Sequence, residues 1–111
     1  MDVIVRTRHI DFSEALRDYA ARRVQFAIGA FAQRLDQADV CIADVNGPRG
    51  GVDKQCVLTL SLKAGGSVFA RGTGTDVYSA VDRAATRIRV LLVRRLSAWT
   101  ASRRPERRLS G

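Results

Sequence analysis

Hydrophobic and polar residues alternate along four short stretches of the chain, and this period of two is typical of strands with one buried face. The alternation is clearest at 54–62, where every second residue is apolar. The other stretches expected to form strands are 2–8, 38–45 and 67–73. The residues of 54–62 expected to face the core are Cys56, Leu58, Leu60 and Leu62.

A glycine-containing turn is expected between the last two strands. A three-residue loop at 64–66 pairs Leu62 with Val68 and keeps the apolar residues of both strands on one face. A two-residue loop at the two glycines would instead place Phe69 and Arg71 on the core face. Because strand register follows the hydrophobic pattern, we expect the longer loop.

Two longer segments repeat apolar residues at helical spacing. The first begins after Ser13, a good N-cap, with Glu14 in the first turn where a negative charge suits the helix dipole. The second spans 75–99 and is capped by Thr75 or Asp76. The stripe expected to be buried in the first helix is Leu16, Ala20, Val24, Ala27 and Phe31. The stripe expected in the second helix is Tyr78, Val81, Ala85, Ile88, Leu92, Leu96 and Trp99.

The order of these elements is strand, helix, three strands, helix. This order predicts an α+β fold, a two-layer sandwich in which two helices cover one face of a four-stranded sheet. A chain of 111 residues suits a single domain, which we place at 1–100. Residues 101–111 are polar, basic and contain Pro105, and we expect them to form a disordered tail.

The net charge of +8 is unevenly placed along the chain. Basic and acidic residues balance over 1–82, whereas 83–111 carries nine arginines and one acid, Glu106. A solvated helix followed by a basic tail is the ordinary explanation for such a run. That explanation is weaker here because no acid interrupts 83–105. The asymmetry indicates an anionic partner, either a nucleic acid or a membrane surface.

Nucleic acid is the favoured partner. Arg83, Arg87 and Arg94 fall together on the polar side of the second helix, and Arg22 and Arg23 of the first helix would join them if the helices pack side by side. The apolar face of the second helix is needed to cover the sheet, so membrane binding ranks lower. No apolar run is long enough to span a membrane and the N-terminus is not a signal peptide, so we expect a cytoplasmic protein.

The glycine-rich stretch 46–54, NGPRGGVDK, raises the question of a phosphate-binding loop. A P-loop places its lysine directly after a glycine and before a helix, and neither condition is met here. A turn between two strands is therefore the better interpretation. Arg49 and Lys54 remain secondary candidates for contact with an anion.

Catalytic and metal-binding chemistry find little support. His9 is the only histidine, and Cys41 and Cys56 lack the spacing of a metal site. We expect a protein that is not an enzyme, with no cofactor, no metal and no small-molecule substrate. Phe69 is the only aromatic residue expected on the open sheet face, so recognition of folded RNA through its phosphates fits better than base stacking.

Two segments, HIDFSEALRDYAARR at 9–23 and GTDVYSAVDRAATRIRVLLVRRL at 74–96, resemble the bacterial ribosome hibernation promoting factor and ribosome-associated inhibitor family, also called the sigma-54 modulation protein family. The D-x-Y-x-A-x-D element is the most specific piece, and the resemblance covers roughly 1–97. It implies binding to small-subunit rRNA near the decoding centre, which blocks the mRNA and tRNA sites of idle ribosomes. The residues of that element are Asp76, Tyr78, Ala80 and Asp82.

The resemblance also assigns site residues. Arg23, Arg87 and Arg94 match basic positions of the family. Phe26 stands where the family often has lysine, and Val90-Leu91 stands where it often has Arg-Gln. The arginines expected to compensate are Arg22, Arg83 and Arg89.

An alternative function follows from the same departures. An apolar patch around Phe26 and Val90 could serve a protein partner or a homodimer instead of RNA. Longer members of the family carry a second domain that pairs ribosomes. This chain has only a basic tail there, and we expect it to be a monomer when free.

Overall fold

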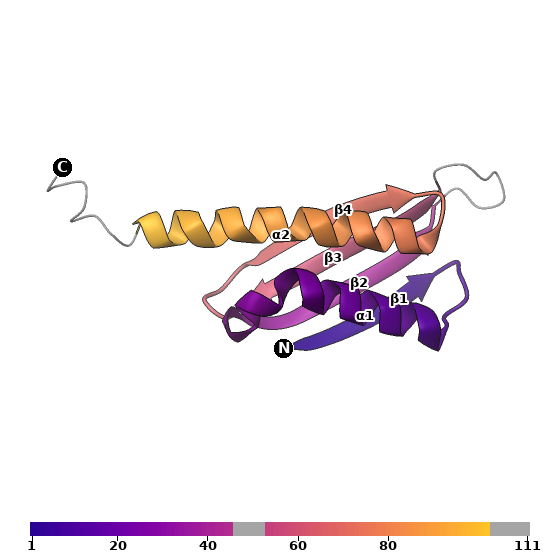
Figure 1. Cartoon of the computed structure of the whole chain (residues 1–111), viewed down its shortest axis with the longest axis horizontal. Helices are drawn as coiled ribbons and strands as arrows, with labels where there is room; N and C mark the ends of the chain where they lie inside the picture. Colours follow the sequence, from indigo (N-terminus) through magenta and orange to yellow (C-terminus); the bar gives the residue numbers. More distant parts are fainter. Residues whose placement is uncertain (46–52, 103–111) are drawn as a thin grey trace, which may run out of the picture.

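A computed structural model of the chain describes residues 1–45 and 53–102, with side chains as far as Ser97. The strands form one sheet, and the helices lie across one face of it in a second layer (Figure 1). A short 3-10 helix, Gly29–Arg34, follows the first helix. The main elements are β1 (Asp2–Arg8), α1 (Glu14–Ile28), β2 (Leu35–Asp44), β3 (Lys54–Leu62), β4 (Ser67–Gly74) and α2 (Val77–Ser102).

The sheet has the order β1-β2-β3-β4, so β1 and β4 are its edges. Strand β1 runs parallel to β2, and α1 is the crossover that this pairing requires. The other two pairs are antiparallel. Both helices cover the same face of the sheet, which confirms the predicted α+β sandwich (Figure 1).

Polar side chains fix the start of each helix, as the sequence predicts. Ser13 Oγ accepts a hydrogen bond from the backbone N–H of Leu16 at 3.1 Å. Asp76 Oδ1 accepts one from the backbone N–H of Ser79 at 2.9 Å, so Asp76 rather than Thr75 caps α2. Helix α2 continues to Ser102, two residues into the predicted tail, and 103–111 lie outside the described residues. Among the described residues, no helix is long and apolar enough to cross a membrane.

The core lies between the helices and the sheet and is built from the expected faces. All four apolar residues predicted to point inward from β3 are buried, as are the α2 residues from Val81 to Leu96 in the predicted stripe. Tyr78 is an exception, because it is exposed and its ring packs edge-on against Tyr19, with centroids 4.9 Å apart. Phe31 is half-buried and lies in the 3-10 helix, and the side chain of Trp99 is outside the described part.

The predicted register of the β3–β4 hairpin is wrong by two residues. Val68 lies opposite Leu60 rather than Leu62. The backbone N–H of Leu62 donates to the carbonyl of Gly66 at 3.0 Å, so the loop lies one residue earlier than expected. Because side chains alternate with a period of two, this shift leaves Val68 on the core face and Phe69 on the open face.

Strand β2 also departs from the expectation. It begins at Leu35, three residues before the predicted start, and the pairing with β3 shifts between Leu35 and Gln37. An irregularity of this kind breaks the simple alternation on which the prediction depends. Leu35 is fully buried, so the added residues extend the core.

Helix α2 lies very close to β4, and a glycine makes this possible. A Cβ atom at Gly72 would stand 2.4 Å from both the carbonyl oxygen of Ala80 and the backbone nitrogen of Ala84. Any side chain there would push the helix off the strand. This close approach brings the polar side of α2 to the open edge of β4.

Candidate nucleic-acid interface

Helices α1 and α2 are joined by a polar cluster centred on Asp82. Tyr19 donates its hydroxyl to Asp82 Oδ1 at 2.5 Å, and Arg23 Nε lies 3.3 Å from the same oxygen. Arg23 also donates from Nη2 to Thr86 Oγ1 at 3.1 Å. The hydrogen bond to Asp82 raises the pKa of Tyr19 above its usual value of 10.0, because it favours the protonated phenol. Arg23, predicted as an RNA ligand, is therefore partly committed to holding the helices together.

The D-x-Y-x-A-x-D element has a structural role at each of its four positions. Asp76 caps α2, and the backbone N–H of Ser79 holds the pKa of this carboxyl below its usual value. Tyr78 packs on Tyr19, Ala80 is fully buried, and Asp82 accepts from Tyr19. The motif thus fixes how α2 begins and how it packs, and it places the arginines that follow.

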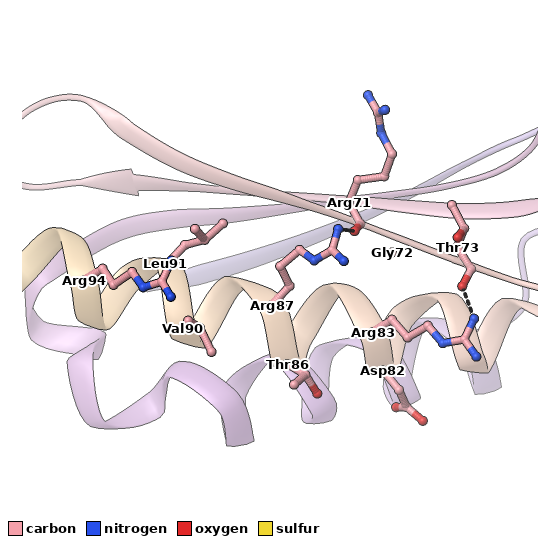
Figure 2. A pocket seen from close by; sticks show the side chains of 10 residues that line it. All are labelled: Arg71, Gly72, Thr73, Asp82, Arg83, Thr86, Arg87, Val90, Leu91 and Arg94. Atoms are coloured by element: carbon pink, nitrogen blue, oxygen red, sulfur yellow. Dashed lines mark hydrogen bonds between the residues drawn. The ribbon is translucent and has the colours of Figure 1, made fainter.

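Arginines of α2 bond the carbonyl groups along the open edge of β4 (Figure 2). Arg83 Nη1 donates to the carbonyl of Thr73 at 2.6 Å, and Arg87 Nη1 donates to that of Arg71 at 3.2 Å. Further along, Arg95 Nη1 donates to the carbonyl of Ser67 at 3.2 Å. Four residues of a helix advance about 6 Å along its axis, and two residues of a strand advance about 6.8 Å. The arginines at four-residue spacing on α2 therefore stay aligned with every second carbonyl of β4.

Arg95 is absent from the predicted site. Its spacing from Arg83 and Arg87, at multiples of four residues, is the signal that groups the three. Helical spacing alone does not reveal that a strand edge lies beneath them.

A groove of about 720 Å³ runs beside α2 along β4. Its lining includes Arg83, Arg87 and Arg94, so three of the predicted RNA ligands come together. Asp82 and Thr86, which bond to Arg23, also line this groove. Within the described residues Arg94 has no hydrogen bond or ion pair, which leaves its guanidinium available to a ligand.

The remaining predicted arginines lie toward α1. Arg89 Nη1 donates to the carbonyl of Ala27 at 2.9 Å and so satisfies a backbone group at the end of α1. Arg22 is exposed on α1. The basic residues therefore form two groups on the two flanks of α2. Arg83, Arg87 and Arg94 lie beside β4, whereas Arg23 of α1 and Arg89 of α2 lie where the two helices meet.

Lys54 is held in a different place, at the start of β3. Its Nζ lies 2.9 Å from Asp53 Oδ1 and 3.6 Å from Asp44 Oδ2, so two carboxylates offset its charge. The hydrogen bond to Asp53, a buried residue, raises the pKa of Lys54. Arg49 and the glycines of the loop lie outside the described residues.

Three apolar side chains of the two helices are exposed. Phe26 is 84% exposed, Val90 47% and Val93 40%. Leu91 is half-buried and packs against the core, so it serves the fold rather than this patch.

Within residues 1–45 and 53–102, no group of three His, Cys, Asp or Glu side chains could hold a metal ion. Cys41 and Cys56 are both free thiols. Burial raises the pKa of the Cys56 thiol to about 12, which makes it unreactive at neutral pH.

The chain is similar to one known protein family over most of its length. The profile of Sigma 54 modulation protein / S30EA ribosomal protein matches residues 3–97. The chain belongs to this family. The family is ribosome-associated and is not a class of enzyme, and the resemblance seen in the sequence is confirmed.

Two solved structures share the fold of this S30EA family member. The Protein Y N-terminal domain of Thermus thermophilus has a TM-score of 0.67 and 23% identity, with 85% of this chain and 98% of that chain covered. A ribosomal subunit interface protein from Coxiella burnetii has a TM-score of 0.68 and 16% identity, with coverage of 87% and 99%. No curated protein matches the chain.

Proposed function

We propose that this protein binds rRNA of the small ribosomal subunit near the decoding centre, as a monomer in the cytoplasm, and blocks the mRNA and tRNA sites. The observation that carries the proposal is the row of arginines on the β4 side of α2, with Arg83, Arg87 and Arg94 lining one groove. Membership of a ribosome-associated family supports the same partner.

The chemistry of this row suits a phosphate backbone. Each guanidinium carries several N–H donors in one plane, and the β4 carbonyls take one donor from Arg83 and one from Arg87. The remaining donors can bind phosphate oxygens in pairs. Because the carbonyls already orient these side chains, little conformational entropy is lost on binding. A folded domain held in the mRNA channel inhibits translation by occupying it, and no reaction is needed.

The first test is co-sedimentation with purified small subunits across a salt series. We expect saturable binding that weakens with salt, because phosphate contacts release counterions. For each contact, the logarithm of the binding constant falls by about 0.7–0.9 for every tenfold rise in salt concentration. An unrelated structured RNA serves as competitor. Failure to bind at low salt, or complete displacement by that competitor, would contradict the proposal.

Arg94→Glu is the most informative single variant, because Arg94 makes no bond elsewhere in the described chain. We expect it to weaken subunit binding by about tenfold or more. Arg6→Glu is the matched control, since it makes the same charge change on β1, at an exposed position on the face opposite the helices. Equal losses in the two variants would mean that only net charge matters and that the α2 groove is not the site.

A second function, as a protein-interaction module or homodimer, is favoured by one observation, the exposure of Phe26, Val90 and Val93. An apolar interface responds little to salt, whereas phosphate binding is steeply salt-dependent. Loss of subunit binding in Phe26→Ser with an unchanged salt slope would favour this function.

A further inference from the structure

The open edge of β4 has a defined set of backbone groups. The N–H of Leu62 donates to the carbonyl of Gly66, which marks a hydrogen-bonded pair of the β3–β4 ladder. Such pairs alternate along antiparallel strands, so the even-numbered residues of β4 bond to β3. The odd-numbered residues turn both their N–H and C=O groups away from β3, toward the open edge. These residues are Ser67, Phe69, Arg71 and Thr73.

The arginines of α2 change what this edge offers to a ligand. Three of its four outward carbonyls accept hydrogen bonds from arginines, and Phe69 is the one exception. Leu91 occupies the helical position, four residues after Arg87, that would reach the Phe69 carbonyl. No hydrogen bond in the described part of the chain uses the N–H groups of Phe69, Arg71 or Thr73. The edge has therefore lost most of its acceptors and kept its donors.

A donor-rich edge discriminates between two kinds of extended partner. A peptide strand that adds to a sheet edge needs donors and acceptors in alternation. A phosphodiester backbone offers acceptor oxygens and negative charge, and edges of this kind bind anions. The arginines add positive charge to the same edge, and Asp82, which also lines the groove, is already bonded by Tyr19 and Arg23.

We propose that the β4 edge, defined as the outward N–H groups of Phe69, Arg71 and Thr73, binds successive phosphates of an RNA strand together with Arg83 and Arg87. This inference rests on the proposed function and extends it, because it assigns phosphate contacts to backbone groups that no side-chain pattern identifies. Successive outward donors lie about 6.8 Å apart along the strand. The groove beside α2 brings the guanidinium groups to the same line.

Proline substitution tests the backbone donors directly. Thr73→Pro removes one outward N–H, and an edge strand tolerates proline at such a position because no ladder bond is lost. The carbonyl that accepts from Arg83 remains. Thr73→Ala is the matched control, since it removes the side chain and keeps the N–H. Phe69→Pro and Phe69→Ala form a second pair.

Each variant is measured for affinity toward small subunits and toward a single-stranded RNA oligonucleotide at one salt concentration. We expect each proline variant to bind about tenfold more weakly than its alanine partner, as for loss of a hydrogen bond to a charged group. Circular dichroism and thermal unfolding establish that both members of a pair are folded.

Amide hydrogen exchange gives a readout that needs no variant. We expect RNA to slow the exchange of the N–H groups of Phe69, Arg71 and Thr73. The N–H groups of Val68 and Ala70, which bond to β3, are the internal control and should change little.

The outcomes separate this proposal from the proposed function. In one outcome the wild type binds subunits, each proline variant binds as tightly as its alanine partner, and RNA adds no protection at the edge. That result overturns the edge site and leaves the proposed function standing. Binding to the oligonucleotide but not to subunits, with the proline effect present, overturns the function and keeps the edge site. Binding to neither RNA overturns both. Self-association that proline abolishes assigns the edge to a protein strand and overturns the RNA proposal.

Discussion

Tyr19 on α1 donates its hydroxyl to Asp82 on α2, and this 2.5 Å hydrogen bond joins two helices that are distant in the sequence. Tyr19→Phe removes the donor and leaves the ring against Tyr78. We expect the free energy of unfolding to fall by about 1 kcal/mol, the usual value for one hydrogen bond. Chemical denaturation measures it. Tyr78→Phe is the control, because no hydrogen bond of the Tyr78 hydroxyl is found in the described chain and its loss should change little.

The same bond makes stability depend on alkaline pH. Its donor is the neutral phenol, whose pKa in the folded protein is raised above 10.0, chiefly by Asp82. The stabilisation is therefore fully present below pH 10.0 and is lost as the pH rises through the folded pKa. Thermal unfolding should show a steeper alkaline decline for the wild type than for Tyr19→Phe. Parallel curves would contradict this role for the bond.

Gly72 is predicted to be intolerant of a side chain. Gly72→Ala places a Cβ 2.4 Å from backbone atoms of α2, which cannot rotate away as a side chain can. We expect a loss of about 1–3 kcal/mol or more in unfolding free energy, as for overpacked cores. Weaker RNA binding should accompany it, because Arg83 and Arg87 would move off β4. Gly29→Ala is the control, since nothing lies within 4 Å of its Cβ position and a change below about 1 kcal/mol is expected.

Asp76 is predicted to contribute stability that acid removes. Its carboxylate accepts from the backbone N–H and the hydroxyl of Ser79, and its pKa is lowered below 3.8, mainly by that N–H. The contribution is therefore present above pH 3.8 and is lost as the pH falls through the folded pKa. Asp76→Asn keeps a capping oxygen that does not titrate. The melting temperature of the wild type should fall relative to this variant below pH 3.8, and a constant difference would argue against the cap.

The two cysteines are predicted to differ in reactivity. Cys56 is buried and its thiol pKa is about 12, whereas Cys41 is half-buried on the open face of the sheet. An alkylating reagent at mildly alkaline pH should label the native protein once, at Cys41, and twice after denaturation. Mass spectrometry measures the count. Native Cys41→Ser should remain unlabelled, and labelling of that variant would show that the core opens readily.

The sequence predicts the fold well where burial decides it. The alternation of Leu58 and Leu60 fixes which face of β3 is inside, and the helical stripes of both helices are correct in their centres. The hairpin register fails because a shift of two residues leaves Val68 on the same face, so hydrophobicity cannot distinguish the two pairings. The turn decides instead, where Gly65 and Gly66 adopt φ angles of 106° and 81°.

The candidate site is less predictable, since it depends on which elements become neighbours. Helical spacing correctly groups Arg83, Arg87 and Arg94, because these lie on one helix. It does not indicate that Arg23 meets Asp82 across the helix junction, nor that Arg95 reaches the carbonyl of Ser67. Those contacts join residues more than 25 positions apart in the chain, and only the packed structure brings them together.

The arginines on the β4 carbonyls have a consequence for which substitutions the chain can accept during evolution. Arg83, Arg87 and Arg95 are exposed, and exposed positions ordinarily vary freely. Alanine here would remove a positive charge and uncover a carbonyl at the same time. Lysine would keep the charge but lose the planar guanidinium, which can donate to a carbonyl and present further N–H donors to solvent at the same time. Such positions should drift as slowly as core residues, although they lie on the surface.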